Sequence, residues 1–310
     1  MNVAFVFPGQ GSQSVGMGRA LFDAFPEARR VFEEIDEALG ESLSKLCFDG
    51  PEDRLRLTAN AQPALLAVSA AAHAVFASRA PKATFYAGHS LGEYSALVAA
   101  NAMGLADAAR AVRARGTFMQ EAVPEGVGAM AAVLGLPPER VREACAAASQ
   151  GEVVAPANYN SPEQTVISGA KDAVARASEE AKRLGAKRVL PLPVSAPFHC
   201  ALMAPVQARL APVLAALTFQ DPRGPVVANV TAEPNSDARR IASLLVEQVT
   251  APVRWVESVQ KLRALGVTDI VELGAGTVLA GLCRRIDSTL KSRSARDAAS
   301  LETALRELAA

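Results

Sequence analysis

The sequence is poor in the residues that build metal sites and disulfide frameworks. Its 310 residues include three histidines and four cysteines, and no two of the cysteines form a C-x-x-C pair. Metal sites and disulfide-rich folds need closely spaced clusters of these residue types. We therefore expect no metal site and no disulfide framework, and we expect the thiols of Cys47, Cys145, Cys200 and Cys283 to be mostly buried and reduced.

An excess of charge of one sign is also absent, as is a long apolar segment. Lys plus Arg and Asp plus Glu each total 32, so the net charge gives no reason to expect nucleic acid or an anionic membrane as a partner. The N-terminal apolar run ends at Pro8, too early for a secretory signal, and the run at residues 64–77 is interrupted by Ser69 and His73. These absences predict a cytoplasmic protein without a membrane segment.

What the sequence has instead is a large apolar content arranged in short runs. Half of the residues are hydrophobic, enough for a core that divides into two domains. Runs at residues 3–7, 83–87, 225–230 and 268–273 are nearly all apolar, which is typical of strands in a parallel sheet covered on both faces. The pattern predicts an α/β domain. The charged segment after Asp287 is expected to form a surface helix.

The middle of the chain has a different expected order of strands and helices. Strands are expected at 129–135, 152–160, 164–169 and 187–193, and helices at 137–149 and 171–185. The order β-α-β-β-α-β is that of the ferredoxin-like unit. We therefore expect residues 126–195 to form a small domain inserted into a large α/β domain made of residues 1–125 and 196–310, with a ligand cleft between the two.

The stretch GHSLGE predicts a nucleophile. Ser90 follows an apolar run and is framed by Gly88 and Gly92, and a helical pattern then extends to near Gly104. Strand, sharp turn and helix are the context of a nucleophile elbow, in which the N–H of Leu91 is a donor to an oxyanion. A serine in a structural turn is the alternative reading of the same motif.

A serine nucleophile needs a base, and the sequence offers three histidines. His89 is adjacent to Ser90 in sequence, so its side chain should point elsewhere, and His73 lies in an apolar helical run. His199 remains, in a loop that Pro197 indicates. A plain α/β-hydrolase has the chain order Ser, acid, His, which the inserted segment does not suit, so something other than a plain esterase is indicated.

Two glycine-rich stretches resemble phosphate-binding loops but lack the necessary residues. FPGQGSQ has Ser14, and GAGTVLAG has Leu279, where the dinucleotide motif requires its third glycine, and neither has a P-loop lysine. Gln10 can instead present its amide or its N–H at the carboxyl edge of the sheet.

A predicted helix at residues 104–123 carries three arginines. Periodicity turns Arg110 away from the apolar stripe and sets Arg113 and Arg115 on its opposite flanks, so spacing leaves the functional arginine open, with solvated side chains as the alternative.

Six motifs together resemble one family. FPGQGSQ, GHSLGE, RGTFMQEAVPEG, NYNSP, APFH and EQVTAPVRW occur in the order found in the malonyl-CoA:acyl carrier protein transacylases of type II fatty acid synthesis, and the resemblance extends to about residue 287. It implies an α/β-hydrolase-like large domain with a ferredoxin-like insertion.

The resemblance also implies a role for individual residues. Ser90 matches the acylated nucleophile, His199 its base, and the main-chain carbonyl of Gln248 the group that orients the imidazole. Gln10 and Leu91 match the residues whose N–H groups bind the oxyanion.

The pocket is implied in the same way. Arg115 matches the arginine that receives the malonyl carboxylate, through two charge-assisted hydrogen bonds. Met119 and Asn160 match pocket positions, and Phe198 accompanies malonyl in related acyltransferases.

The implied reaction is a ping-pong transfer of malonyl from malonyl-CoA, as substrate, to acyl carrier protein, without a cofactor, by a monomer. A hydrolase of esters or thioesters and a catalytically silent carrier-binding module are the alternatives. For the acidic carrier protein we expect a docking patch that includes Lys187, Arg188, Arg284 and Arg285, with scattered solubilising charge as the alternative.

Overall fold

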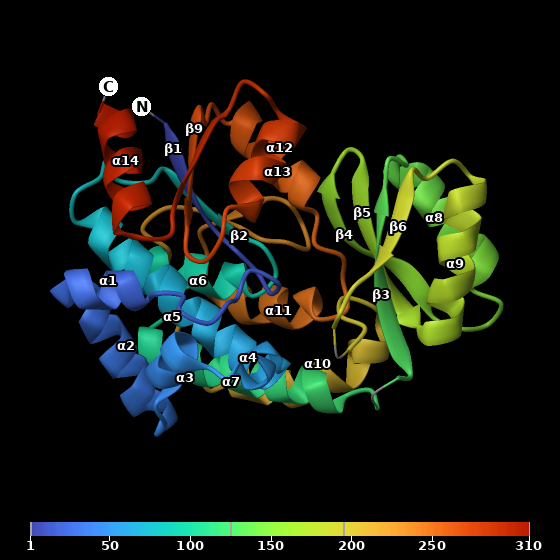
Figure 1. The fold of residues 1–310 in the computed structure, drawn as a ribbon, viewed down its shortest axis with the longest axis horizontal. Coiled ribbons are helices and arrows are strands. Elements are labelled where there is room, and N and C mark those ends of the chain that lie inside the picture. The colour runs from blue at the N-terminus through green and yellow to red at the C-terminus, as the bar shows by residue number, and fades with distance from the viewer. Residues whose placement is uncertain (1, 125, 195, 310) are drawn as a thin grey trace.

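The computed structural model describes residues 2–124, 126–194 and 196–309. Two β-sheets organise it (Figure 1). The larger sheet has the order β10-β9-β1-β2-β7-β8, in which all neighbours are parallel except β7 and β8. Its strands are β1 (Val3–Phe7), β2 (Phe85–Gly88), β7 (Val226–Val227), β8 (Pro234–Asn235), β9 (Asp269–Leu273) and β10 (Lys291–Ala295).

β1 lies inside the large sheet and is buried on both faces. Alternate side chains of a strand point to opposite faces. Phe5 and Phe7 accordingly join one core cluster, whereas Ala4 and Val6 join a second cluster that includes Trp255. This two-sided burial explains why the strand is a continuous apolar run rather than an alternating one.

Helices cover the large sheet on both faces. The N-terminal helices are α1 (Arg19–Ala24), α2 (Pro26–Leu39), α3 (Leu43–Asp49), α4 (Glu52–Arg56), α5 (Thr58–Ala77), α6 (Gly92–Ala99) and α7 (Leu105–Glu121). The C-terminal helices are α10 (Ala204–Ala215), α11 (Ala238–Gln248), α12 (Trp255–Ala264), α13 (Val278–Ile286) and α14 (Ala298–Ala309), and a 3₁₀ turn, Ala201–Met203, precedes α10. In the described ranges we find no helix with the length and apolar character needed to cross a membrane.

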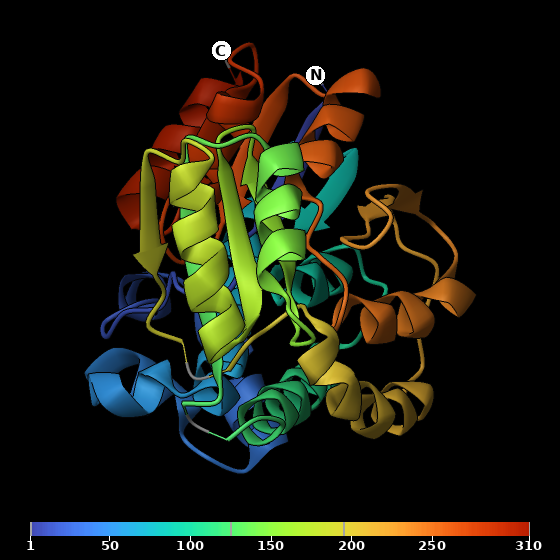
Figure 2. The ribbon, with the colours of Figure 1, turned by 90° about the vertical axis from the view of Figure 1, so that its right-hand side faces the viewer.

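The second sheet is antiparallel and has the order β4-β5-β3-β6. Its elements, in chain order, are β3 (Gly128–Leu134), α8 (Pro138–Ala148), β4 (Val154–Ser161), β5 (Gln164–Ala170), α9 (Lys171–Arg183) and β6 (Arg188–Pro191). Figure 2 shows α8 and α9 side by side in front of the strands, on the face turned away from the large sheet. They bury a separate cluster that includes Val133, Val141 and Ile167.

The two sheets are joined by main-chain hydrogen bonds. The N–H of Val253 donates to the carbonyl of Ala157 at 2.8 Å, and the N–H of Tyr159 donates to the carbonyl of Val253 at 2.9 Å. The segment between α11 and α12 therefore adds one residue of ladder to the free edge of β4.

Three expectations from the sequence were wrong in detail. The segment after Asp287 does not form only a helix: β10 pairs with β9 before α14 begins. The apolar run at 225–230 is a strand over two residues only, because the chain turns at Asn229 to contact Ser90. The helix after Ser90 ends at Ala99 rather than near Gly104.

Candidate active site

Ser90 occupies a strained turn at the carboxyl end of β2. Its φ is 53°, a left-handed conformation that non-glycine residues rarely adopt. A Cβ on Gly92 would lie 2.1 Å from the carbonyl oxygen of Phe7, and one on Gly88 would lie 1.9 Å from the carbonyl carbon of Gly92. Both flanking glycines are thus required by close backbone approach, and the turn projects Ser90 at the edge where α/β sheets place their sites.

His199 is hydrogen-bonded to Ser90. The Ser90 Oγ and His199 Nε2 atoms are 2.7 Å apart, and His199 Nδ1 lies 3.0 Å from the carbonyl oxygen of Gln248 and 3.1 Å from that of Ala251. Two carbonyls can only accept, so they hold the proton on Nδ1 and leave the Nε2 lone pair for the serine. Burial, and then the charge of Arg115, lower the pKa of His199 to about 3, which keeps the imidazole neutral and able to accept a proton at neutral pH.

In the described ranges, two residues with free backbone N–H groups line the cleft beside Ser90. Gln10 and Leu91 both line the cleft that contains Ser90. Neither N–H has a backbone acceptor among the residues that the structure describes. The side chain of Gln10 is held by a 3.2 Å hydrogen bond from its Nε2 to Thr58 Oγ1, so the loop after β1 has a fixed position beside Ser90. Such a pair of donors can stabilise an oxyanion.

Arg115 is the arginine of α7 that faces the nucleophile. Its side chain is fully buried, and Nη2 donates to Ser90 Oγ at 3.1 Å and to Gln248 Oε1 at 2.9 Å, while Nη1 donates to Gln62 Oε1 at 2.8 Å. All three acceptors are neutral oxygens, and Nε has no partner in the described part of the chain. A buried cation with these partners is suited to receive an anionic ligand.

The other two arginines of α7 are engaged elsewhere. Arg113 bonds the carbonyl of Ala59 and pairs with Glu41, and Arg110 pairs with Asp107. Helical periodicity left open which of the three arginines lies at the site, and in the structure it is Arg115 that contacts Ser90.

The cleft lies between the two sheets and has a volume of about 450 Å³. Its described walls come from the large-sheet side and from β3, β4 and the segment after β6, and they include Gln62, Met119, Met130, Asn158, Leu192 and Phe198. Met119 and Phe198 are among the residues that line the cleft. Asn160 is not among these lining residues; its Oδ1 instead bonds His89 Nε2 at 2.8 Å, and His89 is the residue that reaches the cleft.

The four basic residues expected to form a docking patch lie in two separate pairs. Lys187 and Arg188 are at the β6 edge of the small sheet, whereas Arg284 and Arg285 are in the last turn of α13. α13 packs against β4, at the opposite edge of that sheet, so the two pairs lie on opposite sides of the small sheet. None of the four is a lining residue of the cleft.

Sequence reasoning missed the polar residues that support the nucleophile. Asn229 accepts the N–H of Ser90 at 2.7 Å and donates to the carbonyl of Gly88 at 2.7 Å. Glu93, which is buried, accepts the N–H of Asn229 at 3.0 Å and the Nε2 of Gln248 at 2.8 Å. Burial raises the pKa of Glu93 to about 7. The only hint in the sequence is a single acid in the apolar helix GEYSALVA and a single Asn in VVANV.

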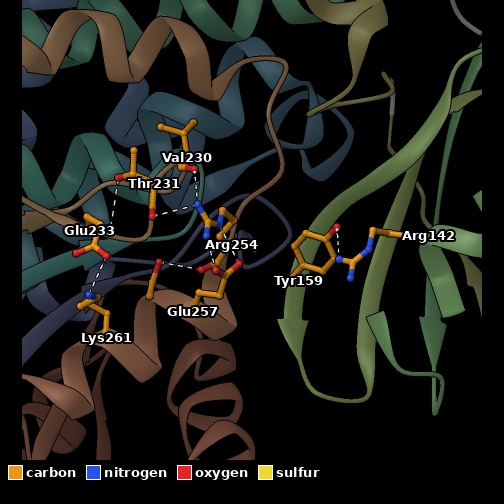
Figure 3. A network of polar contacts seen from close by, with 9 residues as sticks. Arg142, Tyr159, Val230, Thr231, Glu233, Arg254, Glu257 and Lys261 are labelled. Atoms are coloured by element: carbon orange, nitrogen blue, oxygen red, sulfur yellow. Dashed lines mark hydrogen bonds and ion pairs between the residues drawn. The ribbon is translucent and has the colours of Figure 1, made fainter. Parts of the chain in front are cut away.

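Arg254 fixes the loop that carries Asn229. Its N–H bonds the Asn229 carbonyl at 3.2 Å, and Nη1 bonds the carbonyls of Val230 at 3.2 Å and Thr231 at 3.1 Å. Figure 3 shows this guanidinium between the loop and Glu257, with Tyr159 of β4 facing it from the small sheet. Asn229 is therefore held from both sides, by the elbow and by α12.

We looked in the described ranges for groups of three or more His, Cys, Asp or Glu side chains arranged to hold a metal ion, and we found none.

Comparison with known proteins identifies the family. The model of the acyl transferase domain matches residues 4–308. The malonyl CoA-acyl carrier protein transacylase of Escherichia coli (strain K12) is 48% identical over 303 residues, which cover 97% of this chain and 98% of the relative. The chain belongs to the malonyl-CoA:acyl carrier protein transacylase family.

Other members of this family are equally similar in sequence and structure. The transacylase of Bacillus subtilis (strain 168) is 47% identical over 99% of this chain and 97% of its own. The structure of an acyl-carrier-protein S-malonyltransferase from Bartonella henselae superposes with a TM-score of 0.96 at 49% identity, and all of both chains is covered. A type II PKS acyl-carrier protein in complex with its malonyl-transacylase gives 0.97 at 47% identity, with 99% of this chain and 100% of that chain covered. This transacylase family member is thus an acyltransferase with a mixed α/β fold.

Proposed function

We propose that the enzyme transfers a malonyl group from malonyl-CoA to the phosphopantetheine thiol of an acyl carrier protein, by way of a malonyl ester of Ser90. The observation that carries the proposal is the Arg115 guanidinium, buried among neutral oxygens and 3.1 Å from the Ser90 hydroxyl. A malonyl group attached to Ser90 carries a free carboxylate, which a guanidinium binds through parallel charge-assisted hydrogen bonds.

The first half-reaction follows from the geometry around Ser90. His199 Nε2 takes the proton of Ser90 Oγ as Oγ attacks the thioester carbonyl carbon, and the resulting oxyanion accepts the N–H groups of Gln10 and Leu91. When the tetrahedral intermediate collapses, the carbon–sulfur bond breaks and the CoA sulfur leaves with the proton held by His199. The Gln248 carbonyl stabilises the imidazolium in the place of a carboxylate.

The second half-reaction repeats these steps in reverse with another thiol. His199 takes the proton of the phosphopantetheine thiol, the sulfur attacks the Ser90 ester, and the serine oxygen regains the proton as it leaves. A thioester is consumed and a thioester is formed, so no cofactor is needed for energy or for electrons.

We further propose that the chain is an α/β-hydrolase-like domain of residues 1–125 and 196–310 with a ferredoxin-like insertion at 126–195. The β-α-β-β-α-β chain order and the sheet order β4-β5-β3-β6 support the ferredoxin-like insertion.

For the carrier protein, the Lys187–Arg188 pair and the Arg284–Arg285 pair are separate docking candidates. Reversing the charge of each pair alone, and measuring KM for carrier protein, tests them; an unchanged KM in both variants removes the proposal.

Intact-protein mass spectrometry tests the reaction itself. Wild type and Ser90→Ala are mixed briefly with malonyl-CoA, and pantetheinylated carrier protein is then added. The expected result is a malonyl adduct on wild type alone, which then moves to the carrier protein. An adduct that is lost as free malonate with or without carrier protein indicates a hydrolase instead, and transfer by Ser90→Ala at the wild-type rate overturns the assignment of the nucleophile.

A further inference from the structure

Gln248 connects two parts of the site that act on different atoms. Its main-chain carbonyl accepts His199 Nδ1, whereas its side-chain Oε1 accepts Nη2 of Arg115 at 2.9 Å. The side-chain Nε2 donates to the carbonyl of Ser90 at 3.0 Å and to Glu93 Oε2 at 2.8 Å. The residue is completely buried, so no water competes for these bonds.

The amide of Gln248 has only one orientation that satisfies its neighbours. If it were rotated by 180°, its NH₂ group would face the Arg115 N–H donors and its oxygen would face the Glu93 carboxyl and the Ser90 carbonyl. Buried donor–donor and acceptor–acceptor contacts of this kind cost the full desolvation of each group. Glu93 is the partner that makes this preference strong, because its Oε2 accepts two N–H groups and accepts them more strongly when the carboxyl is ionised.

The Glu93 carboxyl itself is held in place. Oε2 also accepts the N–H of Asn229 at 3.0 Å, and Asn229 is bonded to the elbow through Ser90. Gln248 connects Arg115 to Glu93 by two hydrogen bonds: the guanidinium donates to the amide oxygen, and the amide nitrogen donates to the carboxyl. Arg115 is thereby aimed without a carboxylate in contact with it, and it keeps its charge available.

We propose that Glu93 is a positioning residue for acyl-group selectivity: through the Gln248 amide it fixes the direction in which Arg115 presents its guanidinium to the acyl group on Ser90. This inference rests on the proposed function, since it takes a carboxylate-bearing acyl group as the ligand of Arg115. The consequence is that preference for malonyl over acetyl depends on a side chain that touches neither substrate.

The test is the ratio of kcat/KM for malonyl-CoA to kcat/KM for acetyl-CoA, measured with one carrier protein for wild type, Glu93→Gln and Glu272→Gln. Glu272 is a matched control: it is also a buried carboxyl with a pKa raised to about 7 by burial, and its Oε2 accepts the N–H of Ala280 at 2.8 Å. Glu93→Gln is isosteric and removes the carboxylate charge from Oε2, the oxygen that accepts both the Asn229 N–H and Gln248 Nε2. We expect the ratio to fall about tenfold, mostly through malonyl-CoA.

The control separates positioning from stability. Glu272→Gln should lower the melting temperature and leave the ratio within about twofold of wild type, because a loss of folded enzyme affects both donors equally. A ratio in Glu93→Gln that stays within twofold of wild type overturns the proposal, and so does an equal loss for both donors.

A second variant keeps the proposal testable if Glu93→Gln does not fold. Gln248→Met preserves the main-chain carbonyl and the approximate volume but removes the amide, so it should give the same fall in the ratio; an unchanged ratio overturns the proposal. The double variant Glu93→Gln, Arg115→Ala should show no further fall beyond Arg115→Ala alone. If Arg115→Ala itself keeps the malonyl preference, the proposed function of Arg115 fails first; if it loses the preference and Glu93→Gln keeps it, only the positioning role fails.

Discussion

Arg115→Ala is the variant that tests the proposed substrate most directly. The guanidinium is completely buried and bonded to Gln62, Gln248 and Ser90, so its removal leaves a malonyl carboxylate in the cleft without its cation. Truncating one partner of a buried, hydrogen-bonded charge pair costs about 2–5 kcal/mol. Since 1.4 kcal/mol is a factor of ten, kcat/KM for malonyl-CoA should fall by about 30-fold to several-thousand-fold.

Acetyl transfer should respond differently to the same change. An acetyl group has no carboxylate for Arg115 to bind, so it loses only the contact of the guanidinium with Ser90. The assay is kcat/KM for both donors with the same carrier protein, and the ratio should fall at least about 30-fold. Arg113→Ala is the matched control, because Arg113 lies on the same helix but bonds the Ala59 carbonyl outside the site. A malonyl preference that survives Arg115→Ala within about threefold would refute the reasoning.

Three further predictions follow from charge and close packing. In Arg115→Ala the pKa of His199 should rise, because one cause of its depression is removed, so the acid limb of the pH–rate profile for acetyl-CoA should move to higher pH; an unmoved limb contradicts this. Burial lowers the pKa of His73 to about 4, so the unfolded chain binds a proton there more tightly and wild-type stability is lost as pH falls from 6.5 to 4. His73→Phe should therefore become about 3 kcal/mol more stable relative to wild type as the pH falls through that window, measured by urea unfolding. Parallel stability–pH curves for the two proteins would contradict a lowered pKa at His73. Gly92→Ala should destabilise the fold by about 4 kcal/mol or more, because its Cβ would overlap a carbonyl of β1. Gly281→Ala in α13 meets open space and should stabilise the fold by about 0.5–1 kcal/mol. Thermal denaturation of both variants measures the two effects.

Apolar periodicity located the interior strands of the large sheet but not its edges. β1 and β9 have five buried residues each; β1 is entirely apolar, and β9 has three apolar residues beside the buried acids Asp269 and Glu272. β10, with the sequence KSRSA, forms an edge and has only Ala295 buried. Its pairing with β9 comes from main-chain hydrogen bonds, which leave no apolar pattern in the sequence, and the same is true of the two-residue β8.

Ser90 and His199, the proposed nucleophile and base, could be inferred from local sequence, but the residues that support them could not. Ser90 stands in a glycine-framed turn whose geometry demands those glycines, and His199 remained after His73 and His89 were set aside. The supporting polar groups come together only in the folded chain. Glu93 is more than a hundred residues away in sequence from both of its partners, Asn229 and the side chain of Gln248. A single buried acid in an apolar helix is a weak pattern until its partners are known.

The ladder between Val253 and β4 decides how this enzyme can be recombined with its relatives. The same short segment supplies the carbonyls of Gln248 and Ala251 that orient His199 and, two residues later, the strand edge that receives the small sheet. A chimera that exchanges only residues 126–195 would pair a foreign β4 with the native residue Val253. Any mismatch in register would then displace the carbonyls that bond the His199 imidazole. The unit of exchange is therefore discontinuous: residues 126–195 must travel together with the linker at 249–254 if the grafted enzyme is to keep its base in place.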